Sequence, residues 1–124
     1  MTHAVVKPGF ERRDPRGRMI EVVNRGPWHS ILSGEMTAGA VMGQHYHKRT
    51  RILFFIARGR AAIDTLHVET GVRDRIDLHA GEGIVLEPME THAIRFLDPS
   101  EFLMLKSEPF NPKDDDTFAY PIPE

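Results

Sequence analysis

The chain has 124 residues, a formal net charge of −2 and no cysteine. This length suits a single domain, residues 1–124, and a chain of this size buries roughly two-thirds of its unfolded surface, enough for one hydrophobic core. The lack of cysteine excludes disulfides, thiolate metal sites and a cysteine nucleophile.

The same bulk properties disfavour large anionic partners. The small net charge gives no general electrostatic reason to bind nucleic acid or an anionic membrane. The first residues, "MTHAVVKPGF", lack the basic region and apolar run of a signal peptide, and no apolar stretch approaches the length of a membrane-spanning helix. We therefore expect a cytoplasmic protein that acts on a small molecule.

Short apolar segments separated by turn residues predict an all-β domain, because long helical periodicity is absent. The expected strands are, in chain order, residues 18–23, 29–36, 40–47, 51–57, 60–66, 72–78, 83–87, 91–96 and 102–107. Short strands at this spacing indicate a sandwich or a barrel.

Alternation along two of these strands predicts which side chains point inward. In the strand that starts at residue 72, Val72, Ile76 and Leu78 share one face, and the other face is charged. In the strand 91–96, His92 shares the apolar face with Ile94. After these strands comes a segment rich in proline and acidic residues, about 109–124. We expect it to lie along the surface, with Phe110, Phe118 and Tyr120 as anchors.

Three histidines are the candidates for chemistry. His45 and His47 are two residues apart on one strand and therefore point the same way, and His92 points inward from another strand. Three imidazoles that meet inside a small barrel suit one divalent transition metal, such as iron, nickel or zinc. They suit metal-free acid–base chemistry as well, because the pKa of histidine lies near neutrality.

Two stretches resemble the motifs of the cupin family. "GAVMGQHYH", followed by a strand and Gly59, resembles the first cupin motif, and "GEGIVLEPMETH", which ends in His92, resembles the second. "DPRGRMIEV" is similar to the opening of cupins that act on nucleotide-linked deoxysugars. These are the sugar epimerases, the keto-sugar isomerases and the capsular-sugar epimerase domain, which also end with an acidic segment like Asp116–Thr117. The resemblance implies a jelly-roll (double-stranded β-helix) barrel with the three histidines as site residues and metal ligands.

The chain departs from the family at the site itself. Metal-binding cupins carry a glutamate between the two histidines and the glycine, where this chain has Ile52, or Arg51 after a one-residue slip. Met42 replaces an arginine that helps to hold nucleotide-sugars in the relatives, so we expect such ligands to bind weakly or not at all. The candidate substrate-binding residues are Ile52, Phe54, Met42, Arg51 and Glu87.

Three functions remain open from the sequence. The first is an isomerase, epimerase or cyclase acting on a carbonyl compound, with His45 or His47 as the base and Glu87, Glu90 or Tyr120 as its partner. The second is a metal-dependent dioxygenase that holds its ion on three histidines, and a metal-bound and a metal-free site are given equal weight. The third is a binding protein without catalytic activity. We also expect a homodimer that forms through the N-terminal strands around "DPRG", since an unpaired edge favours pairing.

Overall fold

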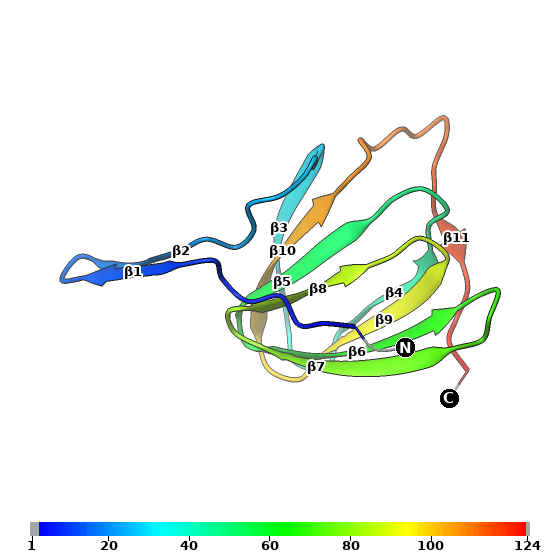
Figure 1. Cartoon of the computed structure of the whole chain (residues 1–124). Helices are drawn as coiled ribbons and strands as arrows, with labels where there is room; N and C mark the ends of the chain where they lie inside the picture. Colours follow the sequence, from blue (N-terminus) through cyan, green and yellow to red (C-terminus); the bar gives the residue numbers. More distant parts are fainter. Residues whose placement is uncertain (1–2, 124) are drawn as a thin grey trace.

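The computed structural model describes residues 3–123, which form strands and loops without a helix. Two antiparallel sheets face each other (Figure 1). The four-stranded sheet has the order β3 (Ser30–Met36), β10 (Ser100–Lys106), β5 (Ile52–Arg58) and β8 (Glu82–Leu86). The five-stranded sheet has the order β11 (Phe118–Ala119), β4 (Val41–Tyr46), β9 (Glu90–Phe96), β6 (Arg60–His67) and β7 (Arg73–His79). The all-β prediction is confirmed, and the described residues contain no helix that is long and apolar enough to span a membrane.

The core lies between the two sheets and is built from alternate residues of each strand. In β5, Ile52, Phe54 and Ile56 point into this core, because alternate residues of a strand share one face. Phe54 meets Phe96 of β9 and Phe102 of β10 with ring centroids 5.5–6.2 Å apart, which joins the two sheets.

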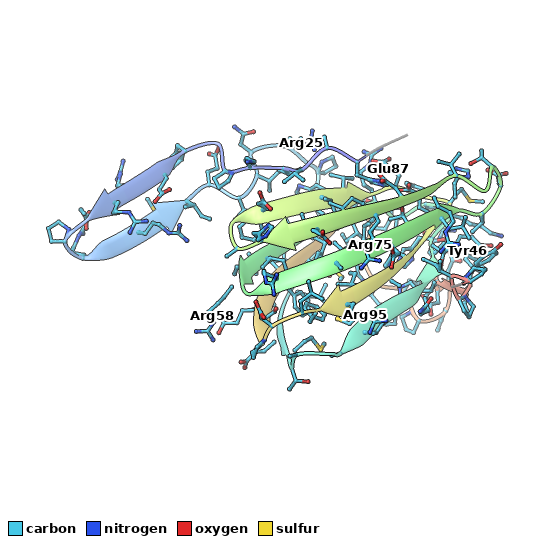
Figure 2. The ribbon with its side chains drawn as sticks, turned by 90° about the horizontal axis from the view of Figure 1, so that it is seen from below. Arg25, Tyr46, Arg58, Arg75, Glu87 and Arg95 are labelled. Atoms are coloured by element: carbon cyan, nitrogen blue, oxygen red, sulfur yellow. The ribbon has the colours of Figure 1, made fainter. Side chains whose placement is uncertain are left out.

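The alternation predicted for β7 and β9 is largely correct. Ile76 and Leu78 are buried, while Arg75 and Arg95 lie on the exposed face of the five-stranded sheet (Figure 2). The inward position predicted for Val72 is wrong, because β7 begins one residue later and Val72 belongs to the turn, where it is 43% exposed.

Strand β1 (Glu11–Asp14) is the strand expected before "DPRG", although its residues "ERRD" carry no apolar alternation. Strand β11 was not expected from the sequence, and it forms because its two residues pair with the edge of β4. Phe118 stacks on Tyr46 with ring centroids 5.4 Å apart, so it anchors the C-terminal tail as predicted. Phe110 is 70% exposed and is not an anchor, contrary to the prediction.

Hairpin β1–β2 stands apart from both sheets at one end of the molecule (Figure 1). Strand β2 (Gly17–Ile20) pairs with β1 alone, and both strands are largely exposed. An isolated two-stranded hairpin is marginally stable in water, and Phe10 and Met19 beside it are about half exposed. This hairpin contains the strands around "DPRG" through which we expect two copies of the chain to form a homodimer.

The homodimer stays a prediction, with the hairpin as its contact. Light scattering at micromolar concentration should give twice the monomer mass of 14.1 kDa. Met19→Arg should shift the distribution toward the monomer, because it places a charge in an apolar contact. A monomeric wild-type protein at that concentration would contradict this prediction.

The N-terminal stretch is fastened to the five-stranded sheet by a buried histidine. His3 lies between two carboxylates, with its Nδ1 2.8 Å from Asp74 and its Nε2 2.9 Å from Glu90. The hydrogen bond to Glu90, with a second to Asp74, raises the pKa of His3 to about 9 despite its burial. The imidazolium therefore joins the chain start to β7 and β9 at neutral pH.

We expect His3→Gln to lower stability in a pH-dependent way. Since the folded-state pKa is raised above 6.5, the charged pair contributes fully below about pH 6.5 and is lost as pH rises through about 9. Urea unfolding should show a loss of about 1–3 kcal/mol near pH 6 and a much smaller one near pH 10. His79→Gln is the control, because the side chain of His79 is 64% exposed and its one ion pair within residues 3–123 is with Glu82. An equal loss for His3→Gln at both pH values would refute the ion-pair account.

Candidate functional site

The three candidate histidines come together at one end of the space between the sheets. His45 is the second-last residue of β4, His47 follows that strand, and His92 lies on the neighbouring strand β9. Their ring centroids are 4.9–5.9 Å apart. One ring nitrogen of each lies within 4.8 Å of the others.

A β-bulge in β4 makes this convergence possible. Gly43 pairs with Ala93, but His45 pairs with His92, so Gln44 is an extra residue in its strand. Gly43 and Gln44 both have positive φ, 99° and 62°. Met42 therefore faces the cavity before the bulge and His45 faces it afterwards, although strict alternation would place them on opposite faces.

Glycine is required at position 43 for a steric reason as well. A Cβ added to Gly43 would lie 2.4 Å from the backbone oxygen of His92 and 3.0 Å from its ring. Strands β4 and β9 therefore approach closely at the point where both present a histidine.

Burial keeps the three imidazoles neutral. His47 and His92 are 6% and 2% exposed. Burial, reinforced by the neighbouring histidines, lowers the pKa of His92 to about 3. Burial also lowers the pKa of His45 and of His47. Neutral rings offer a lone pair, which both a metal ligand and a general base require.

The C-terminal tail determines the tautomer of His47. Its Nδ1 lies within hydrogen-bond distance of the backbone carbonyl of Asp116. A carbonyl only accepts, so Nδ1 donates its proton and the lone pair of the neutral ring resides on Nε2. Within residues 3–123, that Nε2 is buried without a hydrogen-bond partner, as is Nδ1 of His92. An unpartnered buried nitrogen in a cavity is available to a ligand.

The carboxylate of Asp116 holds the tail in place. It accepts hydrogen bonds from the backbone N–H groups of Lys48, Arg49 and Thr50 and from the Thr50 hydroxyl, at 2.8–2.9 Å. Burial raises the pKa of Asp116, but these hydrogen bonds outweigh burial and lower it to about 2. The loop after His47 and the tail thus form one hydrogen-bonded unit.

The histidine cavity has a volume of about 240 Å³, and its remaining walls are largely apolar. It is lined by the three histidines together with Met42, Gly43, Ile52, Ile94, Met104 and Lys106. His47 and Lys106 also line an adjoining cavity of about 260 Å³, which we call the mouth. Sequence reasoning missed Lys106, although the signal was available: it follows Phe102 and Met104 at two-residue spacing on β10.

The candidate substrate-binding residues separate into two groups. Ile52 and Met42 line the histidine cavity, whereas Phe54 is fully buried in the core beyond it. Arg51 and Glu87 form an exposed ion pair at 3.0 Å and line a second cavity. This second cavity, about 330 Å³, also contains Trp28 and Arg25, and Figure 2 shows Arg25 and Glu87 in the same part of the molecule.

None of the suggested partners of the histidine base lines the histidine cavity. Glu87 pairs with Arg51, and Glu90 binds His3. Tyr120 lies over Tyr46 in the tail. The partner of His47 is instead the backbone carbonyl of Asp116, which no pattern of side chains reveals.

The donor atoms fit a transition metal in number and type. Three neutral imidazoles converge, and two of their buried nitrogens have no other partner. The fourth position, where the resemblance to metal-binding cupins places a glutamate, is occupied by the apolar Ile52. The cluster can therefore hold a metal on three histidines, but without a compensating carboxylate.

Comparison with known proteins supports the fold. A family model described as polysaccharide biosynthesis C-terminal domain matches residues 12–118. A 3,4-ketoisomerase from Helicobacter canadensis superposes with a TM-score of 0.78 at 17% identity, over 94% of this chain and 89% of that one. A dTDP-4-dehydrorhamnose 3,5-epimerase from Sulfolobus tokodaii gives 0.77 at 18% identity, over 88% and 72%. The capsular polysaccharide assembling protein CapF from Staphylococcus aureus gives 0.72 at 20% identity, over 91% and 34%.

These matches confirm the cupin prediction, with sugar epimerases and a ketoisomerase as structural neighbours. The chain spans about a third of the length of CapF. Among curated proteins, no sequence matches this chain.

The hydrogen bonds that the Asp116 carboxylate accepts from Lys48, Arg49 and Thr50, here called the tail clamp, yield a prediction about stability. Asp116→Asn places an amide NH₂ against three N–H donors, so we expect the free energy of unfolding to fall by about 1–3 kcal/mol. Because the pKa of Asp116 is lowered from 3.8 to about 2, the wild-type advantage should be full above about pH 4 and fade as pH falls toward 2. Denaturant unfolding at several pH values measures both effects.

Asp115→Asn is the matched control for this clamp. Its carboxylate lines the mouth but makes no side-chain hydrogen bond or ion pair within residues 3–123. If the two variants lost equal stability, the clamp would not be the cause.

Proposed function

The chain belongs to the polysaccharide biosynthesis C-terminal domain family, and we propose that it is an isomerase or epimerase that moves a proton beside a carbonyl group of a sugar-like molecule. One observation carries the proposal: His47 is buried, neutral and held in a single tautomer with its Nε2 lone pair in the cavity. Such a nitrogen is a suitable general base near neutral pH.

The proton transfer needs only groups of the cavity. Nε2 of His47 takes a proton from the carbon next to the carbonyl, the C–H electrons form a C=C bond, and the carbonyl π electrons move to oxygen. Return of the proton to the opposite face of that carbon, after the intermediate has turned in the cavity, gives an epimer. Return of the proton to the former carbonyl carbon gives an isomer, because the hydroxyl on the neighbouring carbon passes its proton to the enolate oxygen and becomes the new carbonyl. His47 then holds the proton between two neutral histidines, and the Asp116 carbonyl keeps its ring oriented.

The substrate class rests on the neighbours and on the cavity. The structural neighbours are named for 4-keto-6-deoxy sugars, for dTDP-4-dehydrorhamnose and for a 3,4-ketoisomerisation. A volume of about 240 Å³ accepts one sugar-sized group. Four carboxylates line the mouth against Arg49 and Lys106, namely those of Glu108, Asp114, Asp115 and Asp116. An acidic mouth disfavours a diphosphate, in line with the expectation that nucleotide-sugars bind weakly.

A second candidate is a metal-dependent reaction at the same histidines. The convergence of three neutral imidazoles with two unpartnered nitrogens favours it. His45, His47 and His92 would hold the ion, and a bound divalent ion would polarise a carbonyl as a Lewis acid.

Exchange of carbon-bound protons in D₂O tests the proposal. We expect the wild-type protein to exchange the proton next to the carbonyl of free keto sugars, with D-fructose and dihydroxyacetone as probes, followed by proton NMR. Thymidine-diphosphate 4-keto-6-deoxyglucose should exchange more slowly at equal concentration. His47→Gln should slow exchange about 10²-fold or more, because the base is gone, while the exposed His79→Gln should not.

Metal content separates the two candidates in the same assay. Exchange that persists after dialysis against a chelator supports acid–base chemistry. Exchange that is lost and then restored by zinc, nickel or ferrous ion supports the metal-dependent candidate. Absence of exchange with all probes, with and without metal, would contradict both for keto sugars.

A further inference from the structure

Lys106 lies in the histidine cavity and had no role in the sequence analysis. It is the last residue of β10, and Phe102 and Met104 precede it on the same inward face. It pairs directly with Ile52 across the β10–β5 ladder. The cation therefore stands beside the position where the resemblance to metal-binding cupins places a carboxylate.

No counter-ion accompanies this lysine. It forms no ion pair with any carboxylate in residues 3–123, whereas Arg49 of the mouth pairs with Asp114 at 3.1 Å and Arg51 pairs with Glu87. Lys106 is half-buried. On its cavity side its neighbours are neutral imidazoles and apolar side chains, and on its mouth side lie carboxylates that form no ion pair with it within residues 3–123. A positive charge next to a largely apolar cavity without a partner favours an anionic ligand.

The charge of Lys106 acts on all three histidines. Its positive field is among the causes that lower the pKa of His45, His47 and His92. The same field opposes the entry of a divalent cation and attracts negative charge that develops in the cavity.

We propose that Lys106 is a catalytic residue that binds the carbonyl oxygen of the substrate and stabilises the negative charge on it during proton transfer. This inference rests on the proposed function. When His47 removes the proton next to the carbonyl, the π electrons of the C=O bond become a lone pair on oxygen, and the ammonium of Lys106 neutralises that charge. The charge leaves the oxygen when the proton returns to carbon, so the step needs no oxidant or reductant.

The arrangement also defines the class of ligand. The carboxylates of the mouth favour the entry of a neutral carbonyl compound over that of an anion. The Lys106 ammonium then stabilises this compound when its carbonyl oxygen becomes negative. Tropolone is a suitable probe, because it is a small planar acid that enters uncharged and presents two adjacent oxygens as its anion. Its ultraviolet absorption distinguishes the anion from the neutral form.

The binding test uses full-length protein dialysed against a chelator. We expect wild-type protein to bind tropolone as its anion, with the anion band in the absorption spectrum. Lys106→Met, which keeps the length of the side chain, should weaken binding at least about tenfold and abolish that band. Lys113→Met is the matched control, since Lys113 is exposed and lines none of the three cavities.

Two results would overturn the inference. One is equal tropolone affinity in wild type and Lys106→Met, and the other is failure of the chelator-treated wild type to bind tropolone anion. A second measurement guards against misfolding of the variant. Zinc affinity of Lys106→Met should rise by about tenfold or more, because a repulsive cation is removed from beside the three histidines. Unchanged or weaker zinc binding would count against a cation that acts on this cavity.

The proposed function and this inference can fail separately. Lys106-dependent tropolone binding without sugar exchange would leave Lys106 as an anion-binding residue and remove the isomerase. Exchange that continues unchanged in Lys106→Met would keep the isomerase and remove the role of Lys106. Where exchange is measurable, Lys106→Met should lower kcat about 10²-fold with little change in KM, because the charge on oxygen develops mainly in the transition state.

Discussion

The register shift at Gly43 and Gln44 is the constraint on which the site depends. Without it, His45 would not lie opposite His92, and Met42 could not share a cavity with His45. The same bulge holds the C-terminal tail, because the backbone oxygen of Gln44 accepts from the N–H of Tyr120 and its side-chain oxygen accepts from Ile122. One local irregularity in β4 thus positions the histidines and also the segment that orients one of them.

The tail completes the site rather than merely covering it. Asp116 contributes two different groups: its carboxylate collects the N–H donors of the loop after His47, and its carbonyl accepts the Nδ1 proton of His47. Burial lowers the pKa of His47 and outweighs the hydrogen bond to this carbonyl and the charges of Asp115 and Asp116, which raise it. The imidazole of His47 is therefore neutral and held in one orientation, with the lone pair on its Nε2 available to a ligand.

The cavity has Ile52 where the resemblance to metal-binding cupins places a carboxylate, and its charges are arranged accordingly. Ile52 makes the wall apolar, burial lowers the pKa of the histidines, and Lys106 adds a positive charge beside them. Three neutral bases with one cation form an arrangement that complements a developing oxyanion. Three neutral ligands can also hold a metal, but the nearby cation reduces the affinity for one.

The sequence by itself determined the all-β class, most strand positions, the inward direction of His92 and the shared direction of His45 and His47, because period-two alternation and turn residues are local properties. It also indicated the cupin fold through two short motifs. Only the tertiary structure decided that Arg51 and Glu87 lie in another cavity, that Asp116 is the partner of His47, and that Lys106 stands beside Ile52. Each of these depends on a contact between residues 36 to 69 positions apart in the sequence. Local patterns carry no information about which distant strand or tail a side chain will meet.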